Sequence, residues 1–335
     1  MDKRNSYKKL FEEFNKLTVM IIGDVMVDSY LWGKVERISP EAPVPIVALR
    51  KRENRMGGAA NVAMNIKSMG ARPILCSVIG DDEKGENFLD LLRQEKIATS
   101  GILLSSRRMT TTKFRIFGNS TQMLRVDEEV QNDLSETDRT NLINNIDTIL
   151  SKEKIDCIIF QDYNKGVINP VVITEIITRA SALKIPITVD PKKKNFNVFV
   201  GVTLFKPNLK ELKEGMKVEF ENNDREKLLE AVKKVREKLQ CKYILTTLSE
   251  QGIFISMKDT LDEKNIFIPA HVRSISDVSG AGDTVISVAS LCLANKCSPY
   301  EIAYISNLAG GLVCEEVGVT PVNKDKLLKE VLALL

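Results

Sequence analysis

The sequence has a single histidine, His271, and a single tryptophan, Trp32, among its 335 residues. Its six cysteines include no C-x-x-C pair, and one histidine is too few for the ligand spacings of common zinc sites. Most of the cysteines lie in apolar runs, where an unpaired cysteine behaves as a small hydrophobic residue. We therefore expect reduced, structural cysteines in a cytoplasmic protein, and no zinc site.

The sequence also lacks an excess of one charge and a long apolar stretch. Its 48 Lys and Arg residues nearly balance 45 Asp and Glu residues, for a formal net charge of +3. Proteins that mainly hold nucleic acid usually carry a concentrated basic excess, so we expect no nucleic-acid partner. No apolar stretch approaches the roughly 20 residues that span a bilayer, so we expect no membrane segment. Residues 1–17 mix acids and bases and predict an amphipathic helix rather than a signal peptide.

Short apolar runs alternate with segments of helical period along most of the chain. Hydrophobic residues make up 43% and charged residues 28%, as in an ordinary globular protein. Continuous apolar runs are typical of parallel strands that are covered on both faces. The predicted strands are residues 18–24, 73–80, 156–162, 185–190, 202–208 and 242–249. The predicted helices are residues 59–69, 84–95, 135–151, 170–183, 224–239, 282–295, 299–315 and 324–335.

This alternation predicts an α/β fold with a doubly wound, mostly parallel sheet and helices on both faces. Two segments, 43–51 and 109–130, have strand composition but are half polar, which suits a small sheet with one wet face. We expect them to form a β lid, mainly from about residues 30–50 and 108–128, inserted into a single domain over 1–335. Because the edges of such strands can pair, we also expect a homodimer through the lid.

Polar residues directly follow the predicted strands. Ligands of open α/β sheets bind beyond the carboxyl ends of the strands, so these residues are candidates for a binding site. An aspartate at such a position is often only a turn or capping residue, but several on one rim favour a polar ligand. The sets are Gly23-Asp24, Gly80-Asp81, Gln161-Asp162-Tyr163, Asp190-Pro191-Lys192, Lys206-Pro207-Asn208 and Thr247-Leu248-Ser249.

The most specific segment is D-V-S-G-A-G-D-T, residues 277–284, which opens an apolar helix. Gly280, Ala281 and Gly282 predict a tight turn whose free N–H groups and helix dipole favour an anion. Asp283 lies at the same helix start, where its carboxylate could accept a proton from a substrate hydroxyl. Phosphoryl transfer requires such an anion site beside a base, although a merely structural capped helix would have the same sequence.

Five motifs, in sequence order, resemble those of the ribokinase-like (PfkB) carbohydrate kinases. S-G-A-G-D resembles the family signature, and G-D-V-M-V-D and G-G-A-A-N-V-A resemble its two sugar-binding stretches. K-P-N-L-K-E-L contains the family's N-x-x-E pattern, and T-L-S-E-Q-G resembles its nucleotide-binding T-x-G-x-x-G stretch. The resemblance covers residues 17–323 and implies a kinase that uses ATP and Mg²⁺.

The resemblance also implies a role for each matched residue. The catalytic group would be Asp283 as base, with the anion site at Gly280, Ala281 and Gly282. Sugar hydroxyls would be bound by Asp24, Asp28, Gly57, Gly58 and Asn61. The nucleotide would be bound by Asn208, Glu211, Thr247, Ser249, Gly252, Asp277 and Asn307, with Mg²⁺ held through water by Asn208 and Glu211. Ser249 replaces a family glycine, and a monovalent cation near the Asp277 loop, as in some relatives, stays open.

A narrower resemblance concerns the sugar. Residues 37–47, 118–129, 162–166 and 189–196 look like the heptose-7-phosphate kinases of ADP-heptose synthesis. This implies transfer to the anomeric 1-hydroxyl of D-glycero-D-manno-heptose 7-phosphate, giving heptose 1,7-bisphosphate for lipopolysaccharide core or surface glycans. Three cations on the lid or the rim could hold the 7-phosphate, or could be solvated surface residues: Arg125, Lys165 and Lys192. Because many such kinases are fused to a nucleotidyltransferase and this chain ends at Leu335, we expect a separate transferase downstream.

Other functions stay open at this point. A kinase of the same family acting on ribose, a nucleoside or a fructose phosphate would share Asp283 and differ in the lid. A nicotinamide-dependent dehydrogenase has a similar sheet, but its G-x-G-x-x-G motif belongs after the first strand, where this chain has G-D-V-M-V-D-S-Y. A sugar sensor without catalysis would not need Asp283, Asn208 and Glu211 together. The sugar's anomer and its ADP or GDP destination also stay open.

Overall fold

A mostly parallel β-sheet forms the centre of the molecule in the computed structural model, which describes residues 3–258, 263–271 and 273–334. The strands are Thr18–Gly23 (β1), Arg72–Gly80 (β4), Ile102–Ser105 (β5), Cys157–Gln161 (β8), Ile187–Asp190 (β9), Leu204–Phe205 (β10), Tyr243–Thr247 (β11), Ile253–Lys258 (β12) and Glu263–Ile268 (β13). Their order is β13-β12-β11-β10-β9-β8-β1-β4-β5. Neighbours from β11 to β5 are parallel, whereas β12 and β13 are antiparallel.

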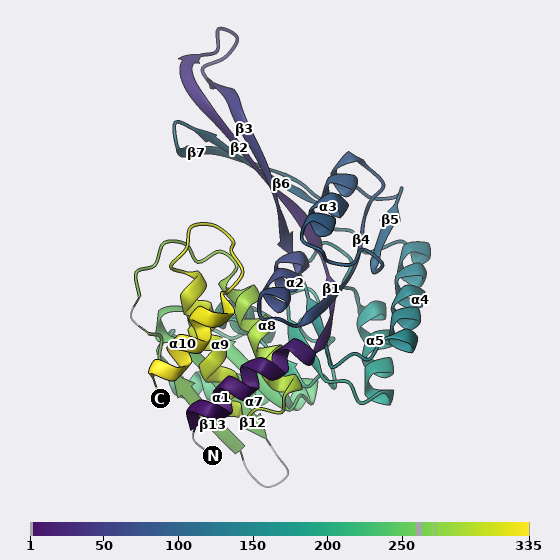
Figure 1. Ribbon diagram of the computed structural model, residues 1–335, viewed down its shortest axis with the longest axis vertical. Helices are drawn as coiled ribbons and strands as arrows, with labels where there is room; N and C mark the ends of the chain where they lie inside the picture. The colour runs from purple at the N-terminus through teal and green to yellow at the C-terminus, as the bar shows by residue number, and fades with distance from the viewer. Residues whose placement is uncertain (1–2, 259–262, 272, 335) are drawn as a thin grey trace.

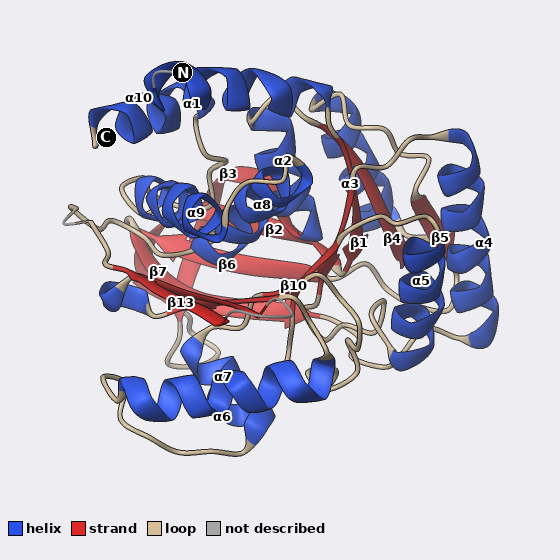
Figure 2. Ribbon diagram, turned by 90° about the horizontal axis from the view of Figure 1, so that it is seen from below, coloured by secondary structure: helices blue, strands red, loops and turns tan. Residues whose placement is uncertain are grey.

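Helices cover both faces of this sheet (Figure 2). On one face lie Lys3–Glu13 (α1), Ala59–Ser68 (α2), Glu83–Gln94 (α3), Ala281–Ala294 (α8), Pro299–Val313 (α9) and Lys324–Ala333 (α10). On the other lie Glu136–Lys152 (α4), Pro170–Ala182 (α5), Leu209–Met216 (α6) and Arg225–Leu239 (α7). The alternating residues of each buried strand therefore feed two apolar cores, and each fully buried Leu or Ile stabilises the fold by roughly 1.5–3 kcal/mol. This confirms the predicted α/β class.

A second sheet of four strands extends out of the body as a lid (Figure 1). Its strands are Val25–Ile38 (β2), Pro45–Gly58 (β3), Thr112–Gly118 (β6) and Thr121–Glu128 (β7), in the order β3-β2-β6-β7. β2 and β3 extend beyond the predicted range of 30–50 into the body, whereas β6 and β7 lie within the predicted range of 108–128. Val25 pairs with Gly58 and Val27 with Thr112, and only Asp24 separates the end of β1 from the start of β2. The first stretch predicted to bind sugar, G-D-V-M-V-D, is therefore largely strand.

Most predicted elements are present within one to three residues of their expected bounds. Helix α6 and strands β5, β12 and β13 were not predicted. β5 and β13 are the edge strands of the large sheet, where partial cover gives shorter or more polar runs than a central strand needs. The helix predicted over 324–335 ends at Ala333, and Leu335 lies outside the described residues. Among the described helices, none combines the length and the apolar character needed to cross a bilayer.

Candidate active site

A cavity of about 1160 Å³ opens at the carboxyl ends of the central strands. It is large enough for a small-molecule ligand, since such pockets commonly measure about 300–1,000 Å³. Four predicted catalytic residues line it: Gly280, Ala281, Gly282 and Asp283. So do most of the residues predicted for the nucleotide, together with one predicted substrate cation: Asn208, Glu211, Thr247, Ser249, Gly252, Asn307 and Lys192. The tertiary structure thus assembles segments that are far apart in the chain.

The turn before α8 is open to this cavity. Gly280 has φ +81°, a left-handed conformation that side-chain-bearing residues rarely adopt. The N–H group of Ala281 donates to the carbonyl of Val278 at 3.3 Å. The N–H groups of Gly282 and Asp283 donate to no residue that the structure describes, and Gly282 is exposed. Two backbone donors at a helix start are therefore available to an anion.

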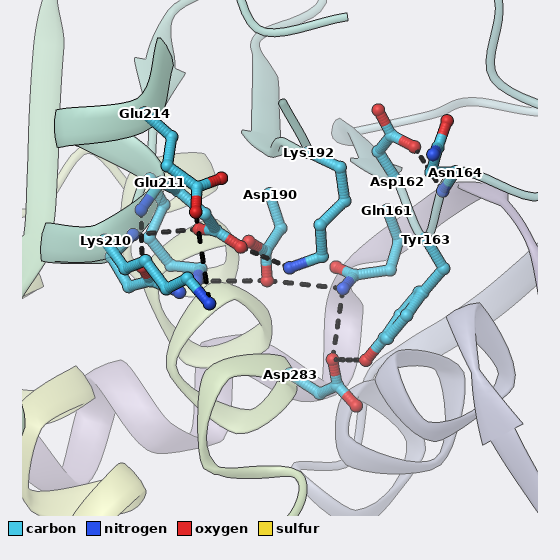
Figure 3. A network of polar contacts seen from close by, with 12 residues as sticks. Gln161, Asp162, Tyr163, Asn164, Asp190, Lys192, Lys210, Glu211, Glu214 and Asp283 are labelled. Carbon is cyan, nitrogen blue, oxygen red and sulfur yellow. Dashed lines mark hydrogen bonds and ion pairs between the residues drawn. The ribbon is translucent and has the colours of Figure 1, made fainter. Parts of the chain in front are cut away.

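Asp283 is 5% exposed and is held by three donors, of which Gln161 and Tyr163 are seen in Figure 3. Nδ2 of Asn61 lies 2.7 Å from Oδ2 of Asp283. The hydroxyl of Tyr163 lies 2.7 Å from Oδ1, and Nε2 of Gln161 lies 3.0 Å from the same oxygen. Burial raises the pKa of Asp283 to about 6, against the lowering effect of the hydrogen bonds from Asn61 and Tyr163. At neutral pH this carboxylate is ionised and basic enough to take a proton.

A buried ion pair lies beside the turn. Nζ of Lys206 is 3.0 Å from Oδ2 of Asp190, and the two side chains are 3% and 7% exposed. Nε2 of Gln161 donates to the same Asp190 oxygen at 3.2 Å, which links the pair to Asp283 (Figure 3). A Cβ atom built on Gly282 would lie 3.7 Å from Nζ of Lys206. A desolvated cation thus stands next to the free N–H groups, where it would strengthen binding of a negative group.

The N-x-x-E segment caps α6. Oδ1 of Asn208 accepts the N–H of Glu211 at 2.8 Å, and Oε2 of Glu211 accepts the N–H of Asn208 at 2.9 Å. The other Glu211 oxygen pairs with Lys192. Burial alone would lower the pKa of Lys192, but the carboxylates of Asp190 and Glu211 outweigh it and raise the pKa. Lys192 also lies over the ring of Tyr163. Its pairing with Glu211 places it beside a residue that is predicted to bind the nucleotide.

Asp24 is bound within the chain. Its Oδ2 accepts the N–H groups of Tyr163 at 2.9 Å and Lys165 at 3.1 Å, and its Oδ1 accepts that of Val167 at 2.9 Å. Burial raises the pKa of Asp24, and these backbone donors counteract the shift. Asp24 does not line the cavity and anchors the loop over residues 163–167. The carboxylate of Asp24 thus accepts three backbone hydrogen bonds, and its predicted contact with sugar hydroxyls stays a prediction.

Asp28 lies at the base of the lid, at the junction with the body. Its Oδ1 accepts Nη1 of Arg115 at 2.6 Å. Gly57 pairs across from Met26, and a Cβ there would lie 2.3 Å from Oδ2 of Asp28, so a larger residue would displace this carboxylate. Gly58 follows as the N-cap of α2, which places Asn61 in the first turn against Asp283. The predicted sugar residues thus lie between the lid and Asp283.

The predicted phosphate cations separate into two places. Lys165 pairs with Glu129 at 2.7 Å and is 11% exposed, whereas Arg125 is exposed and pairs with Asp127 at 2.8 Å. Lys113, which the sequence did not single out, interacts with both cations. Burial first, then Arg125 and Lys165, lower its pKa. These three residues, the lid cluster, lie where lid and body meet, and Lys192 is not among them.

The remaining predicted nucleotide residues differ in their placement. Ser249 adopts φ +54°, so it keeps the left-handed conformation that explains a glycine at this position in the resembling family. Asn307 donates from Nδ2 to the carbonyl of Pro269 at 2.8 Å and lines the cavity. Asp277 does not line it. Its carboxylate accepts the N–H groups of Ser279 and Gly318, which holds the loop that precedes α8.

Four residues of the site received no role from the sequence: Gln161, Tyr163, Asp190 and Lys206. Each belongs to a set that directly follows a predicted strand, so the rim rule for open α/β sheets did flag the positions. What the sequence lacked was a way to tell which member of each set points toward Asp283.

Comparisons with known proteins agree with this geometry. The family model for the pfkB family carbohydrate kinases matches residues 16–326. The Bifunctional protein HldE of Campylobacter jejuni subsp. jejuni is 40% identical over 315 residues, which are 93% of this chain and 64% of that protein. The Helicobacter pylori protein of the same name is 38% identical over 301 residues, 90% of this chain and 63% of that protein. The chain thus spans a little under two thirds of the length of these curated relatives.

Solved structures of low identity share the fold. The tetrameric inhibited form of phosphofructokinase-2 from Escherichia coli superposes with a TM-score of 0.75 at 18% identity, covering 95% of this chain and 98% of that one. Arabidopsis thaliana ribokinase, complexed with ribose and ATP, gives a TM-score of 0.69 at 16% identity, covering 93% and 98%. Because the carbohydrate-kinase family model matches residues 16–326, the protein is a phosphotransferase and the dehydrogenase alternative is rejected. The chain belongs to the pfkB family of carbohydrate kinases.

Proposed function

We propose that this kinase transfers the γ-phosphoryl group of ATP to the anomeric 1-hydroxyl of D-glycero-D-manno-heptose 7-phosphate, giving heptose 1,7-bisphosphate. The observation that carries the phosphoryl transfer is the position of Asp283, a buried carboxylate beside two free N–H groups at the edge of the cavity. The choice of sugar rests on the motifs of the lid and the rim, including residues 118–129 and 162–166, and on the lid cluster.

The proposed mechanism assigns each step to a residue at the cavity. Asp283 takes the proton of the 1-hydroxyl as the oxygen attacks phosphorus. The N–H groups of Gly282 and Asp283 stabilise the charge on the transferred group, and Lys206 adds a positive charge next to them. Ala281 contributes less than the sequence predicted, because its N–H already bonds to Val278.

Mg²⁺ fits the donors at the start of α6. The oxygens of Asn208 and Glu211 are hard donors that suit Mg²⁺, an ion that usually keeps several waters. Both oxygens of Glu211 have partners within the chain, which favours the predicted contact through water. When bound, Mg²⁺ would neutralise charge on the nucleotide phosphates. Thr247, Ser249, Gly252 and Asn307 would hold the remainder of the nucleotide.

The lid cluster is the proposed site of the substrate's 7-phosphate. Lys113 is 15% exposed, and its nearest carboxylate oxygen, on Asp127, is 3.9 Å away, beyond hydrogen-bond distance. Oε2 of Glu129, beside Lys165, is buried and has no hydrogen-bond partner among the described residues. A phosphate dianion beside Lys113 would supply the acceptor that this cation lacks, and it would compete with Glu129 for Lys165 and with Asp127 for Arg125.

The lid's two faces differ, which supports the proposed homodimer. Along β2, Asp28 and Tyr30 share one face with Lys113 and Arg115 of β6, while Leu31 pairs with Ile116 on the other. Leu124 and Val126 of β7, opposite Ile116 and Phe114, are 55% and 41% exposed. An exposed apolar patch of this kind favours a protein partner, and we propose a second copy.

The six unpaired cysteines fit the expected cytoplasmic location. We also propose that a nucleotidyltransferase acts downstream of this kinase.

A panel of acceptors tests the proposed substrate. ADP release from ATP is measured with heptose 7-phosphate, fructose 6-phosphate, ribose and a nucleoside at equal concentrations. We expect heptose 7-phosphate to give the highest kcat/KM by at least tenfold, with a product that carries phosphate at C1. A higher kcat/KM with any other acceptor would replace the proposed substrate and leave the family assignment unchanged.

A further inference from the structure

The carboxylate of Asp283 has unequal oxygens. Oδ1 accepts two hydrogen bonds, from the hydroxyl of Tyr163 at 2.7 Å and from Nε2 of Gln161 at 3.0 Å. Oδ2 accepts one, from Nδ2 of Asn61 at 2.7 Å. An ionised carboxylate offers about two acceptor positions on each oxygen. Oδ1 is therefore full, and Oδ2 keeps one position for a substrate.

We infer that Tyr163 is a positioning residue for Asp283: its hydroxyl helps to fill Oδ1, so that Oδ2 receives the proton of the sugar hydroxyl. This rests on the proposed role of Asp283 as the base. In the step, the O–H bond of the sugar breaks, its oxygen bonds to phosphorus, the bond from phosphorus to the ADP oxygen breaks, and the proton ends on Oδ2. Tyr163 keeps its own proton throughout.

Tyr163 is tied to three parts of the site. Its backbone N–H donates to Asp24 at the end of β1, its ring lies under Nζ of Lys192 at 5.7 Å, and its hydroxyl reaches α8 (Figure 3). Burial and the carboxylate of Asp283 raise the pKa of Tyr163 well above its usual value, so the phenol stays protonated and can donate to Asp283. A ring fixed at both ends orients Asp283 without adding a charge.

Removing this hydroxyl should change the basicity of Asp283 in a known direction. The charged groups that face Asp283 are Asp190 at the end of β9, which raises the pKa of Asp283, and Lys206 directly after β10, which lowers it. Lys192 also interacts with Asp283, from the loop after β9. None of these is altered by Tyr163→Phe. The variant loses one hydrogen bond to the ionised form, so the pKa of Asp283 should rise.

The first measurement is a pH–rate profile. We compare kcat/KM between pH 5 and 9, with ATP and heptose 7-phosphate, for wild type, Tyr163→Phe and Tyr304→Phe. Tyr304 is the matched control, because its hydroxyl is buried and has no hydrogen-bond partner among the described residues. We expect the acidic limb of Tyr163→Phe to move up by about one pH unit, with most of the activity regained above it. A lower rate at every pH with an unmoved limb would indicate a merely structural role and overturn the inference.

The second measurement needs no substrate. Tm is recorded against pH for wild type, Tyr163→Phe, Asp283→Asn and the double variant. The stabilisation from a raised native pKa is lost as pH rises through that pKa, so a higher pKa of Asp283 lets Tm keep falling to a higher pH. The Tm–pH curve of Tyr163→Phe should therefore differ from that of wild type. The difference should vanish in the Asp283→Asn background. Should heptose 7-phosphate give no turnover while this Tm pattern holds, the proposed substrate fails and the coupling of Tyr163 to Asp283 stands. Near-normal turnover of Asp283→Asn would overturn the base and the inference together.

Discussion

Nδ2 of Asn61 lies 2.7 Å from Oδ2 of Asp283, although 222 positions separate the two residues in the sequence. Asn61 belongs to the first turn of α2, directly after the lid strand β3, and Asp283 belongs to the first turn of α8. The contact therefore joins the residues expected at the sugar to the residue expected to activate it. Because the amide donates to the oxygen that would take the proton, Asn61 also helps to fix the orientation of that oxygen.

Replacing Asp283 by Asn should reduce kcat by about 10²-fold or more, the usual scale for loss of a general base. The amide keeps the size of the side chain but cannot take a proton. ATP affinity, measured by calorimetry, should change little, since the N–H groups at the start of α8 remain. A variant that kept near-normal turnover would show that another group is the base.

The pKa of Asp283, raised by burial to about 6, predicts opposite effects of pH on activity and on stability. Activity requires the ionised form, so kcat/KM should rise as pH increases through about 6. The raised native pKa stabilises the fold below the unfolded value of 3.8, and this contribution is lost as pH rises through about 6. Urea titrations from pH 4 to 8 measure the free energy of unfolding, and the difference between wild type and Asp283→Asn gives the contribution of Asp283. Taking this difference removes the contribution of buried Asp162, whose pKa is also raised to about 6.

Replacing Lys206 by Met should destabilise the protein by about 3–5 kcal/mol, because it leaves the buried carboxylate of Asp190 without its cation. Urea unfolding measures this loss. In the matched double variant Lys206→Met/Asp190→Asn the orphan charge is gone, so much of the stability should return. Turnover should stay low in both variants, because the cation beside Gly282 is missing. Full activity in the stable double variant would contradict a role for Lys206 in phosphoryl transfer.

Lys165→Ala and Lys192→Ala should have different kinetic effects. Lys165 belongs to the lid cluster, so its loss should raise KM for heptose 7-phosphate at least tenfold and change KM for the unphosphorylated heptose little. Lys192 pairs with Glu211, so its loss should affect KM for ATP and kcat instead. Steady-state kinetics with both sugars distinguishes the two. Equal effects of the two variants on the phosphorylated sugar would return Lys192 to the phosphate site.

Replacing Leu124 and Val126 by Lys should disrupt the proposed homodimer, because both side chains lie on the exposed apolar face of the lid. Light scattering after gel filtration gives the mass, with Met123→Lys as a control on the neighbouring position of β7. We expect wild type at twice the chain mass and the double variant at the chain mass. A monomeric wild type would remove the dimer from the proposal.

The local elements and the phosphoryl-transfer motif could be predicted from residue type and spacing. Continuous apolar runs predicted the central strands because a strand covered on both faces must be apolar at every position. The turn at Gly280 could be predicted because few residues other than glycine adopt φ +81° before a helix. The cap of α6 by Asn208 and Glu211 depends only on a spacing of three residues, yet from the sequence we assigned this pair to Mg²⁺ and the nucleotide and did not predict the helix. The edge strands β5 and β13 were not predicted, because a strand that is only partly covered by other elements has a weaker apolar pattern.

Which polar residues contact one another depends on the three-dimensional fold. The order β10-β9-β8-β1 brings Lys206, Asp190, Gln161 and Asp24 to one rim, and no local pattern encodes that order. The contacts of Asp24 with the backbone of the 163–167 loop, of Lys192 with Glu211 and of Tyr163 with Asp283 therefore could not be predicted from local sequence. The physical reason is that a side chain's partner depends on the crossovers that set strand adjacency, whereas residue type and spacing report only on the segment that contains them.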